Sequence, residues 1–176
     1  VAIGYEAGTA ITTGVQNVVL GGRALQANTV GADNVAIGYQ ALFANVDGSR
    51  SVAIGSNALV AQEPASAVEM HNVAIGYNAG FAVTTGVRNT LIGSLAGDTI
   101  TTGNFNTALG YQALAAEDTG NYNTAIGYKA LALQDAGDAY NTAVGFNAGN
   151  AITTAVKNTL VGGLAGDSIT TGGNNT

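Results

Sequence analysis

The 176-residue sequence contains no cysteine, no tryptophan, one proline and one histidine, His71. Metal sites built from cysteine and histidine, and nucleophile triads that depend on histidine, are therefore excluded. The chain carries five basic residues against eleven acidic ones, and no apolar run approaches the roughly 20 residues of a membrane-spanning helix. We therefore expect no enzymatic activity, cofactor, metal or membrane span in this segment. We also expect no nucleic-acid partner, because the basic residues are scattered singly along the chain: Arg23, Arg50, Arg88, Lys129 and Lys157.

What the sequence does contain is glycine, at 26 positions, and a repeat. A reference glycine recurs at intervals of 17 residues, with one interval of 21 and one of 18. A fixed period of this kind indicates a solenoid in which each repeat forms one coil. The reference glycines are Gly4, Gly21, Gly38, Gly55, Gly76, Gly93, Gly110, Gly127, Gly145 and Gly162.

Three further positions keep their residue type relative to the reference glycine. Alanine follows it by three residues in every copy, and a second glycine follows by ten in most copies, which predicts a turn with positive φ or a close backbone approach. Asparagine precedes it by four residues, except for Ser51, and predicts a ladder of stacked side chains. Well-formed copies of the pattern include Asn34, Ile37, Gly38 and Ala41; Asn72, Ile75, Gly76 and Ala79; and Asn123, Ile126, Gly127 and Ala130.

Between asparagine and glycine lies a short segment with period-2 alternation, such as Val73–Ala74–Ile75, which predicts a β-strand. One face carries β-branched residues and the other carries small ones, so neither resembles a solvent face. We expect the β-branched face to pack inside the coil and the small-residue face to contact another chain. A bulky residue at Ala74 or Ala125 would then disrupt assembly, whereas the loop at Asp135 would tolerate one.

Two stretches carry a resemblance to known proteins. The segments Asn34–Ala41 and Asn72–Ala79 resemble the head repeats of trimeric autotransporter adhesins. The stretch Thr119–Leu131, T-G-N-Y-N-T-A-I-G-Y-K-A-L, is similar to repeats in phage tail fibres and related surface proteins. The resemblance implies an all-β fold, a left-handed parallel β-roll wound as a homotrimer. We read residues 1–176 as a single repeat domain of about ten coils from a longer fibre, extracellular on a virion or a bacterial surface.

Several residues outside the repeated positions are candidate functional sites. Three acidic pairs have the composition of a glycoside-hydrolase site, namely Glu117 with Asp118, Asp135 with Asp138, and Glu63 with Glu69; we favour solubilising charge for all of them. Asp98 and Asp167 lack the spacing of calcium-binding solenoids. The Thr–Thr pairs of the I-T-T-G segments match an ice-binding row, but coils with leucine interrupt them.

An aromatic residue often follows the reference glycine, and we expect it to pack rather than to bind sugar. The aromatic residues at this position are Tyr5, Tyr39, Tyr77, Tyr111, Tyr128 and Phe146. The longest insertion, 60–71, is the segment we choose as a specialised contact loop, through Glu63, Pro64, Glu69, Met70 and His71. The leading hypothesis is a fibre segment that spaces and presents surfaces for attachment to a host receptor or glycan. A carbohydrate-active tailspike and a monomeric ice-binding solenoid are the alternatives.

Overall fold

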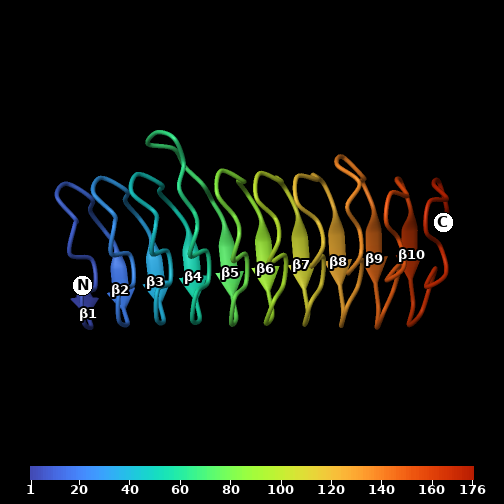
Figure 1. Ribbon diagram of the computed structural model, residues 1–176, viewed down its shortest axis with the longest axis horizontal. Coiled ribbons are helices and arrows are strands. Elements are labelled where there is room, and N and C mark those ends of the chain that lie inside the picture. The colour runs from blue at the N-terminus through green and yellow to red at the C-terminus, as the bar shows by residue number, and fades with distance from the viewer.

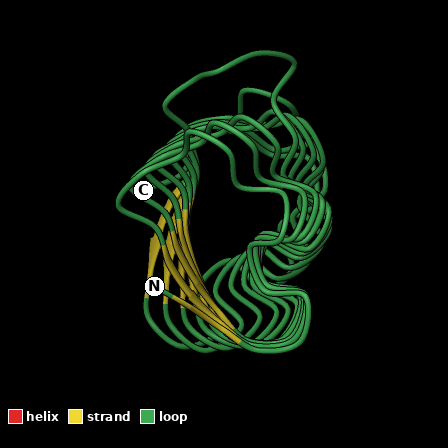
Figure 2. Cartoon of the chain, turned by 90° about the vertical axis from the view of Figure 1, so that its left-hand side faces the viewer, coloured by secondary structure: helices red, strands yellow, loops and turns green.

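The computed structural model describes residues 1–176 as one elongated stack of coils (Figure 1). Each coil contributes one short strand, and the rest of the coil consists of turns and loops (Figure 2). Glycine and asparagine at the turns leave only three consecutive extended residues in most copies. The strands are β1 (Ala2–Ile3), β2 (Val18–Leu20), β3 (Val35–Ile37), β4 (Val52–Ile54), β5 (Val73–Ile75), β6 (Thr90–Ile92), β7 (Thr107–Leu109), β8 (Thr124–Ile126), β9 (Thr142–Val144) and β10 (Thr159–Val161).

The ten strands form one parallel sheet in sequence order, so the predicted parallel β-solenoid is confirmed. Equivalent residues pair directly, as Ile37 with Ile54 and Ile54 with Ile75. Each residue type of the repeat therefore forms a straight column along the fibre axis. The four residues inserted before β5 do not disturb this register, because they leave the stack as a projecting loop (Figure 1).

The reference glycines are required by both backbone conformation and space. Their φ angles lie between 131° and 140°, a region that residues with a side chain rarely adopt. A Cβ atom on Gly76 would lie 2.6 Å from the carbonyl carbon of Gly93 in the next coil. No other residue fits this column without separating the coils.

The second glycine column is explained by close approach alone. Gly31, Gly86 and Gly103 do not have positive φ, but a Cβ atom at each would collide with a carbonyl oxygen of the following coil. Gly137 is the exception, with a φ of 65° and no neighbour within 4 Å of a Cβ atom. It lies in the 18-residue repeat, where the turn with one additional residue adopts a different backbone conformation.

The expected assignment of the two strand faces is wrong. The small residues at the strand centres, including Ala74 and Ala125, are fully buried inside the coil. The flanking residues, such as Val73 and Ile75, point outward and remain partly exposed. The reason is the narrow interior, in which the side chains four and seven residues after the reference glycine leave room for only a methyl group at most strand centres. A bulky residue at Ala74 or Ala125 would overpack the core of a single chain.

The core contains two kinds of coil. In each kind, the larger apolar side chain lies either four or seven residues after the reference glycine. Where leucine stands four residues after the reference glycine, the residue at position seven is polar, as in Leu42 with Asn45. Where glycine stands there, position seven is isoleucine or valine, as in Gly80 with Val83. We call the coils with leucine at position four leucine coils and those with glycine there glycine coils. Where two glycine coils are adjacent, a leucine replaces alanine at the strand centre. Leu91 fills this space, since a Cβ atom on Gly80 or Gly97 would lie 2.8 Å from it.

The predicted asparagine ladder is present along the sheet edge that precedes the strands. Each Oδ1 accepts a hydrogen bond from the backbone N–H of the equivalent residue in the next coil, at 2.8–3.1 Å. In most coils the Nδ2 group donates to the carbonyl oxygen of the second glycine in the next coil, as from Asn106 to Gly120 at 2.7 Å. Buried amides that are satisfied in this way hold successive coils in register.

Where Ser51 interrupts the asparagine ladder, Gln62 supplies the side-chain hydrogen bonds that are missing. Gln62 Nε2 donates to Ser51 Oγ and to Asn45 Oδ1, both at 3.1 Å. Gln62 Oε1 then accepts a hydrogen bond from Asn72 Nδ2 at 3.0 Å. A longer side chain from the polar interior column thus replaces the contacts that serine is too short to make.

Replacing Gly76 by alanine should destabilise the fold by more than about 3 kcal/mol, because strain at φ and backbone overlap act together. Gly163→Ala is the matched control, since Gly163 lacks positive φ and has open space around a Cβ atom. Its effect should stay within about 1 kcal/mol. Denaturant unfolding of both variants measures the difference, and equal effects would contradict the crowding of the reference column.

Asn106→Ala and Asn123→Ala should differ in their cost. Asn106 makes both of its ladder bonds, whereas the buried Nδ2 group of Asn123 has no hydrogen-bond partner. We expect the free energy of unfolding to fall by about 1 kcal/mol more for Asn106→Ala, one hydrogen bond's contribution. Unfolding curves in urea test this, and a larger loss for Asn123→Ala would be the contrary result.

Candidate interaction surfaces

The outward face of the sheet is a regular surface that runs through all ten coils. It consists of two columns, one of valine or threonine and one of isoleucine, leucine or valine, on either side of the buried strand centres. In the middle of the fibre these side chains are partly exposed, as in the burial pattern of β3, β4 and β5. A straight apolar strip of this length is unusual for a surface that meets only water.

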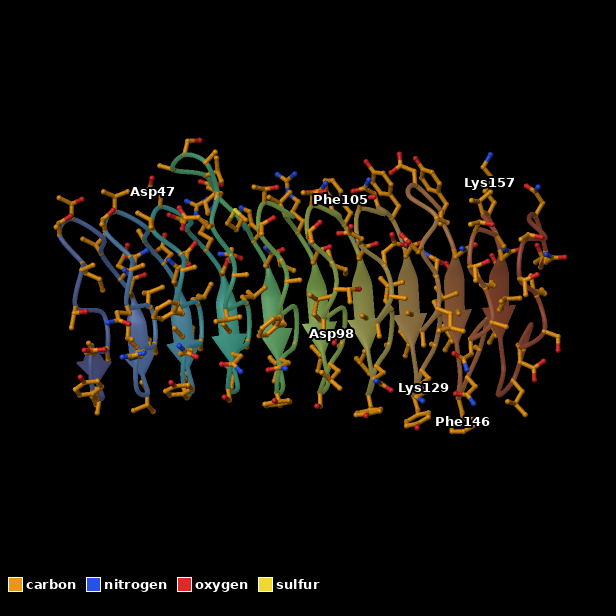
Figure 3. The ribbon with its side chains drawn as sticks, viewed as in Figure 1. Asp47, Asp98, Phe105, Lys129, Phe146 and Lys157 are labelled. Carbon is orange, nitrogen blue, oxygen red and sulfur yellow. The ribbon has the colours of Figure 1, made fainter.

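Two aromatic ladders flank this face. The leading ladder, Phe105, Tyr122 and Tyr140, precedes the ladder asparagines, and its rings stack with centroids 5.1–5.2 Å apart. The trailing ladder, Tyr111, Tyr128 and Phe146, follows the reference glycines, with centroids 5.3–5.5 Å apart. Figure 3 shows Phe105 and Phe146 toward opposite ends of the strands.

The prediction that the aromatic column after the reference glycine is packed is wrong for the single chain. Its members are between 42% and 72% exposed, from Tyr128 to Tyr5. The reason is that this position follows the strand on its outward side, so the rings can bury only against each other. In the first coils glycine or serine separates the rings, and stacking is confined to three coils.

Two cations near the ladders, Arg88 and Lys129, lie over aromatic rings. The Arg88 guanidinium lies 5.3 Å from the ring centroid of Phe105, and the Lys129 ammonium lies 5.6 Å from that of Tyr128. In the first half, Arg23 and Arg50 pair with carboxylates instead. The surface around the ladders therefore lacks ion pairs that would have to be broken on contact with a partner.

The inserted segment 60–71 is anchored at its base and exposed at its tip. Met70 is fully buried, Pro64 is buried, and Glu63 accepts a hydrogen bond from the backbone N–H of Val46 at 2.9 Å. Glu69 lies beside Arg50 and His71, and the hydrogen bond from His71 lowers the pKa of Glu69. Of the five residues chosen from the sequence, only Glu69 and His71 are exposed.

The acidic pairs do not share one environment. Glu117 is fully buried, so its assignment as solubilising charge is wrong, whereas its neighbour Asp118 is exposed. Glu117 accepts hydrogen bonds from Gln134 Nε2 at 2.8 Å and from the Gly120 N–H at 2.7 Å. It occupies the interior polar column that holds Asn45 and Gln62 elsewhere. Asp135 and Asp138 are both exposed in the loop of the 18-residue repeat.

The remaining candidates lie apart from one another. Asp98 is half-buried, with one carboxylate oxygen that lacks a partner, and burial raises its pKa. Asp167 is exposed at the end of the stack, and no cluster of three or more potential metal ligands exists in the chain. Thr12, Thr84 and Thr153 donate hydrogen bonds to the carbonyl oxygen of the equivalent threonine segment in the next coil.

A shallow groove of about 460 Å³ lies on the wall after the trailing ladder. Ala115 and Ala132 form its floor, and Gln112, Lys129 and Asn150 supply polar atoms at its sides. It exists because the column that holds Gln26, Phe43 or Phe81 in other coils is reduced to alanine in two adjacent ones. Sequence reasoning missed the groove, although the change in residue size along this column was visible.

Comparison with protein-family models, with curated proteins and with solved structures gives no match. The fold is therefore established by the geometry of the chain alone. The chain also contains no helix long and apolar enough to cross a bilayer.

Burial raises the pKa of Glu117 above its ordinary value of 4.5. The folded state then holds this proton more tightly than the unfolded state, so the contribution of Glu117 to stability is largest below pH 4.5 and is lost as the pH rises through the raised pKa. We expect wild-type stability relative to Glu117→Gln to fall as the pH rises above 4.5 and through the raised pKa.

Urea unfolding at a series of pH values measures this difference. Asp118→Asn, at the exposed neighbouring position, is the control and should follow the wild-type profile. Parallel profiles for wild type and Glu117→Gln would show that the buried carboxyl does not titrate with folding.

Proposed function

We propose that this chain is a structural segment of a surface fibre, in which three copies wind side by side and present their loops to a host receptor or glycan. The observation that carries the proposal is the outward face of the sheet, on which one of the two columns is isoleucine, leucine or valine in every coil. A stack that served alone in water would be expected to alternate such residues with polar ones in this column, as antiparallel sheets place polar residues on their solvated side. The number three rests on the resemblance to trimeric fibre repeats.

The size of the face supports self-association. Ten coils at about 4.8 Å each and a strand width of about 10 Å give roughly 500 Å² per copy. Two such faces together reach about 1,000 Å², the lower limit for a specific interface, before any flanking residue contributes. A column of valine, threonine and isoleucine is also nearly flat, and flat regular surfaces match copies of themselves.

The same architecture suits a spacer that presents contacts. The stack holds its register through buried asparagines and glycines, so each loop projects at a fixed height along the axis. The inserted segment 60–71 projects farthest (Figure 1), and Glu69 and His71 are exposed on either side of the buried Met70, where the segment rejoins the stack. We propose that this loop takes part in attachment outside the cell, at a virion or bacterial surface.

Leu109 and Leu133 provide a matched test of the interface. Both leucines are exposed, at 43% and 54%, but Leu109 lies on the outward face and Leu133 lines the groove. Leu109→Lys should weaken self-association at least about 100-fold, because burying an unpaired ammonium group costs several kcal/mol. Leu133→Lys should leave it unchanged.

Light scattering over a range of concentrations measures the mass of both variants and of the wild type. The wild type should have three times the chain mass of 17.4 kDa. A monomeric wild type, or equal behaviour of the two variants, would refute the proposed interface.

A further inference from the structure

The two aromatic ladders occupy the same three coils. Phe105 precedes β7 and Tyr111 follows it; Tyr122 and Tyr128 enclose β8 in the same way; Tyr140 and Phe146 enclose β9. In these coils both edges of the outward face carry a ring at the same height along the fibre.

The coincidence is confined to this part of the chain. Ahead of β3, β4 and β5 the leading position carries Asp33, Arg50 and His71, which belong to the charged cluster around Glu69. After β2 and β4 the trailing position is Gly22 or Ser56. Only the coils of β7, β8 and β9 thus have two aromatic edges.

Rotational symmetry would bring the two ladders of neighbouring copies together. When copies are related by rotation about an axis parallel to the fibre, equivalent coils lie at the same height, and the leading edge of one copy adjoins the trailing edge of the next. The leading ladder then meets the partner's trailing ladder along its whole length. In an antiparallel pair, leading edges would meet with the coil order reversed, and Tyr122 would face Asp33.

Energetics favour the first arrangement. The six ladder rings are 42–54% exposed, so much of their surface is still available for burial. Aromatic pairs gain from contact with one another, whereas the antiparallel arrangement would desolvate Asp33 and Arg50 against rings. The positions that flank the two ladders are not aromatic, so a slip of one coil would leave two ring pairs between copies in place of three.

We propose that copies of this chain associate parallel and in register, with Phe105, Tyr122 and Tyr140 of one copy packed against the trailing ladder of the next. This inference rests on the proposed self-association and specifies its orientation and register. The ladders fix the register of an outward face on which valine, threonine and isoleucine change little between adjacent coils.

The absence of cysteine makes the arrangement directly testable. In the double variant Tyr122→Cys/Tyr128→Cys, the two thiols of one chain are about 20 Å apart along the strand. A bifunctional thiol reagent that spans less than about 10 Å, or two coils, can then link them only between copies. We expect a covalently closed oligomer in which nearly all thiols are consumed.

Two control variants distinguish the other arrangements. Tyr77→Cys/Tyr122→Cys places the thiols three coils apart in height, about 14 Å, and should not link in the parallel in-register assembly. Asp33→Cys/Tyr122→Cys should link only in an antiparallel one. Linking of either control as efficient as that of Tyr122→Cys/Tyr128→Cys overturns the proposal.

Light scattering on the same samples distinguishes the ladder contact from self-association as such. An oligomer in which Tyr122→Cys/Tyr128→Cys does not link would refute the ladder contact and leave self-association standing, whereas a monomer would refute both. If the cysteine variants assemble poorly, photo-oxidation of the unmodified chain is the second measurement. Peptide mapping should then find dityrosine between Tyr122 and Tyr128, and links confined within each ladder would contradict the proposal.

Discussion

Close stacking of nearly identical coils is the constraint on which the rest of this structure depends. Parallel hydrogen bonding places each residue directly above its equivalent, at a spacing of about 4.8 Å. A residue type is therefore selected by whether it fits on a copy of itself. Glycine is required where a Cβ atom would enter the next coil's backbone, as at Gly76 above Gly93, and asparagine suits a buried edge because it satisfies a backbone N–H of its neighbour.

The same constraint explains why the coils still differ. A fixed cross-section must be filled in every coil, so volume removed at one position returns at another. Leucine with a polar partner and glycine with isoleucine or valine are two solutions for the same interior, and Leu91 belongs where two glycine coils adjoin. Glu117 follows this rule too, because its carboxyl group occupies the polar position of a leucine coil. Differences that do not affect the stack are left to the surface columns and loops.

Much of the fold could be predicted from the sequence, because a constant period leaves few architectures for glycine-rich, three-residue strands. The period, the ladder role of Asn34 and Asn72 and the fully buried Ala41 and Ala79 all hold in the structure. The face of the strand could not be predicted. Alternation between Val73 and Ala74 shows that two faces differ, but only the width of the coil decides that the alanine lies inside. The shape of the coil also decides that Tyr77 is exposed and that Glu117 is buried. The residues next to them in the sequence do not indicate this burial.

The outward face and the ladders that flank it connect this geometry with a fibre that functions as several copies. Mass per unit length, obtained from small-angle scattering of the purified chain, tests this central claim most directly, because it depends on both the rod and the number of chains. The account predicts three chains of 17.4 kDa per stack of about 48 Å. A rod with the mass of one chain over that length would contradict it.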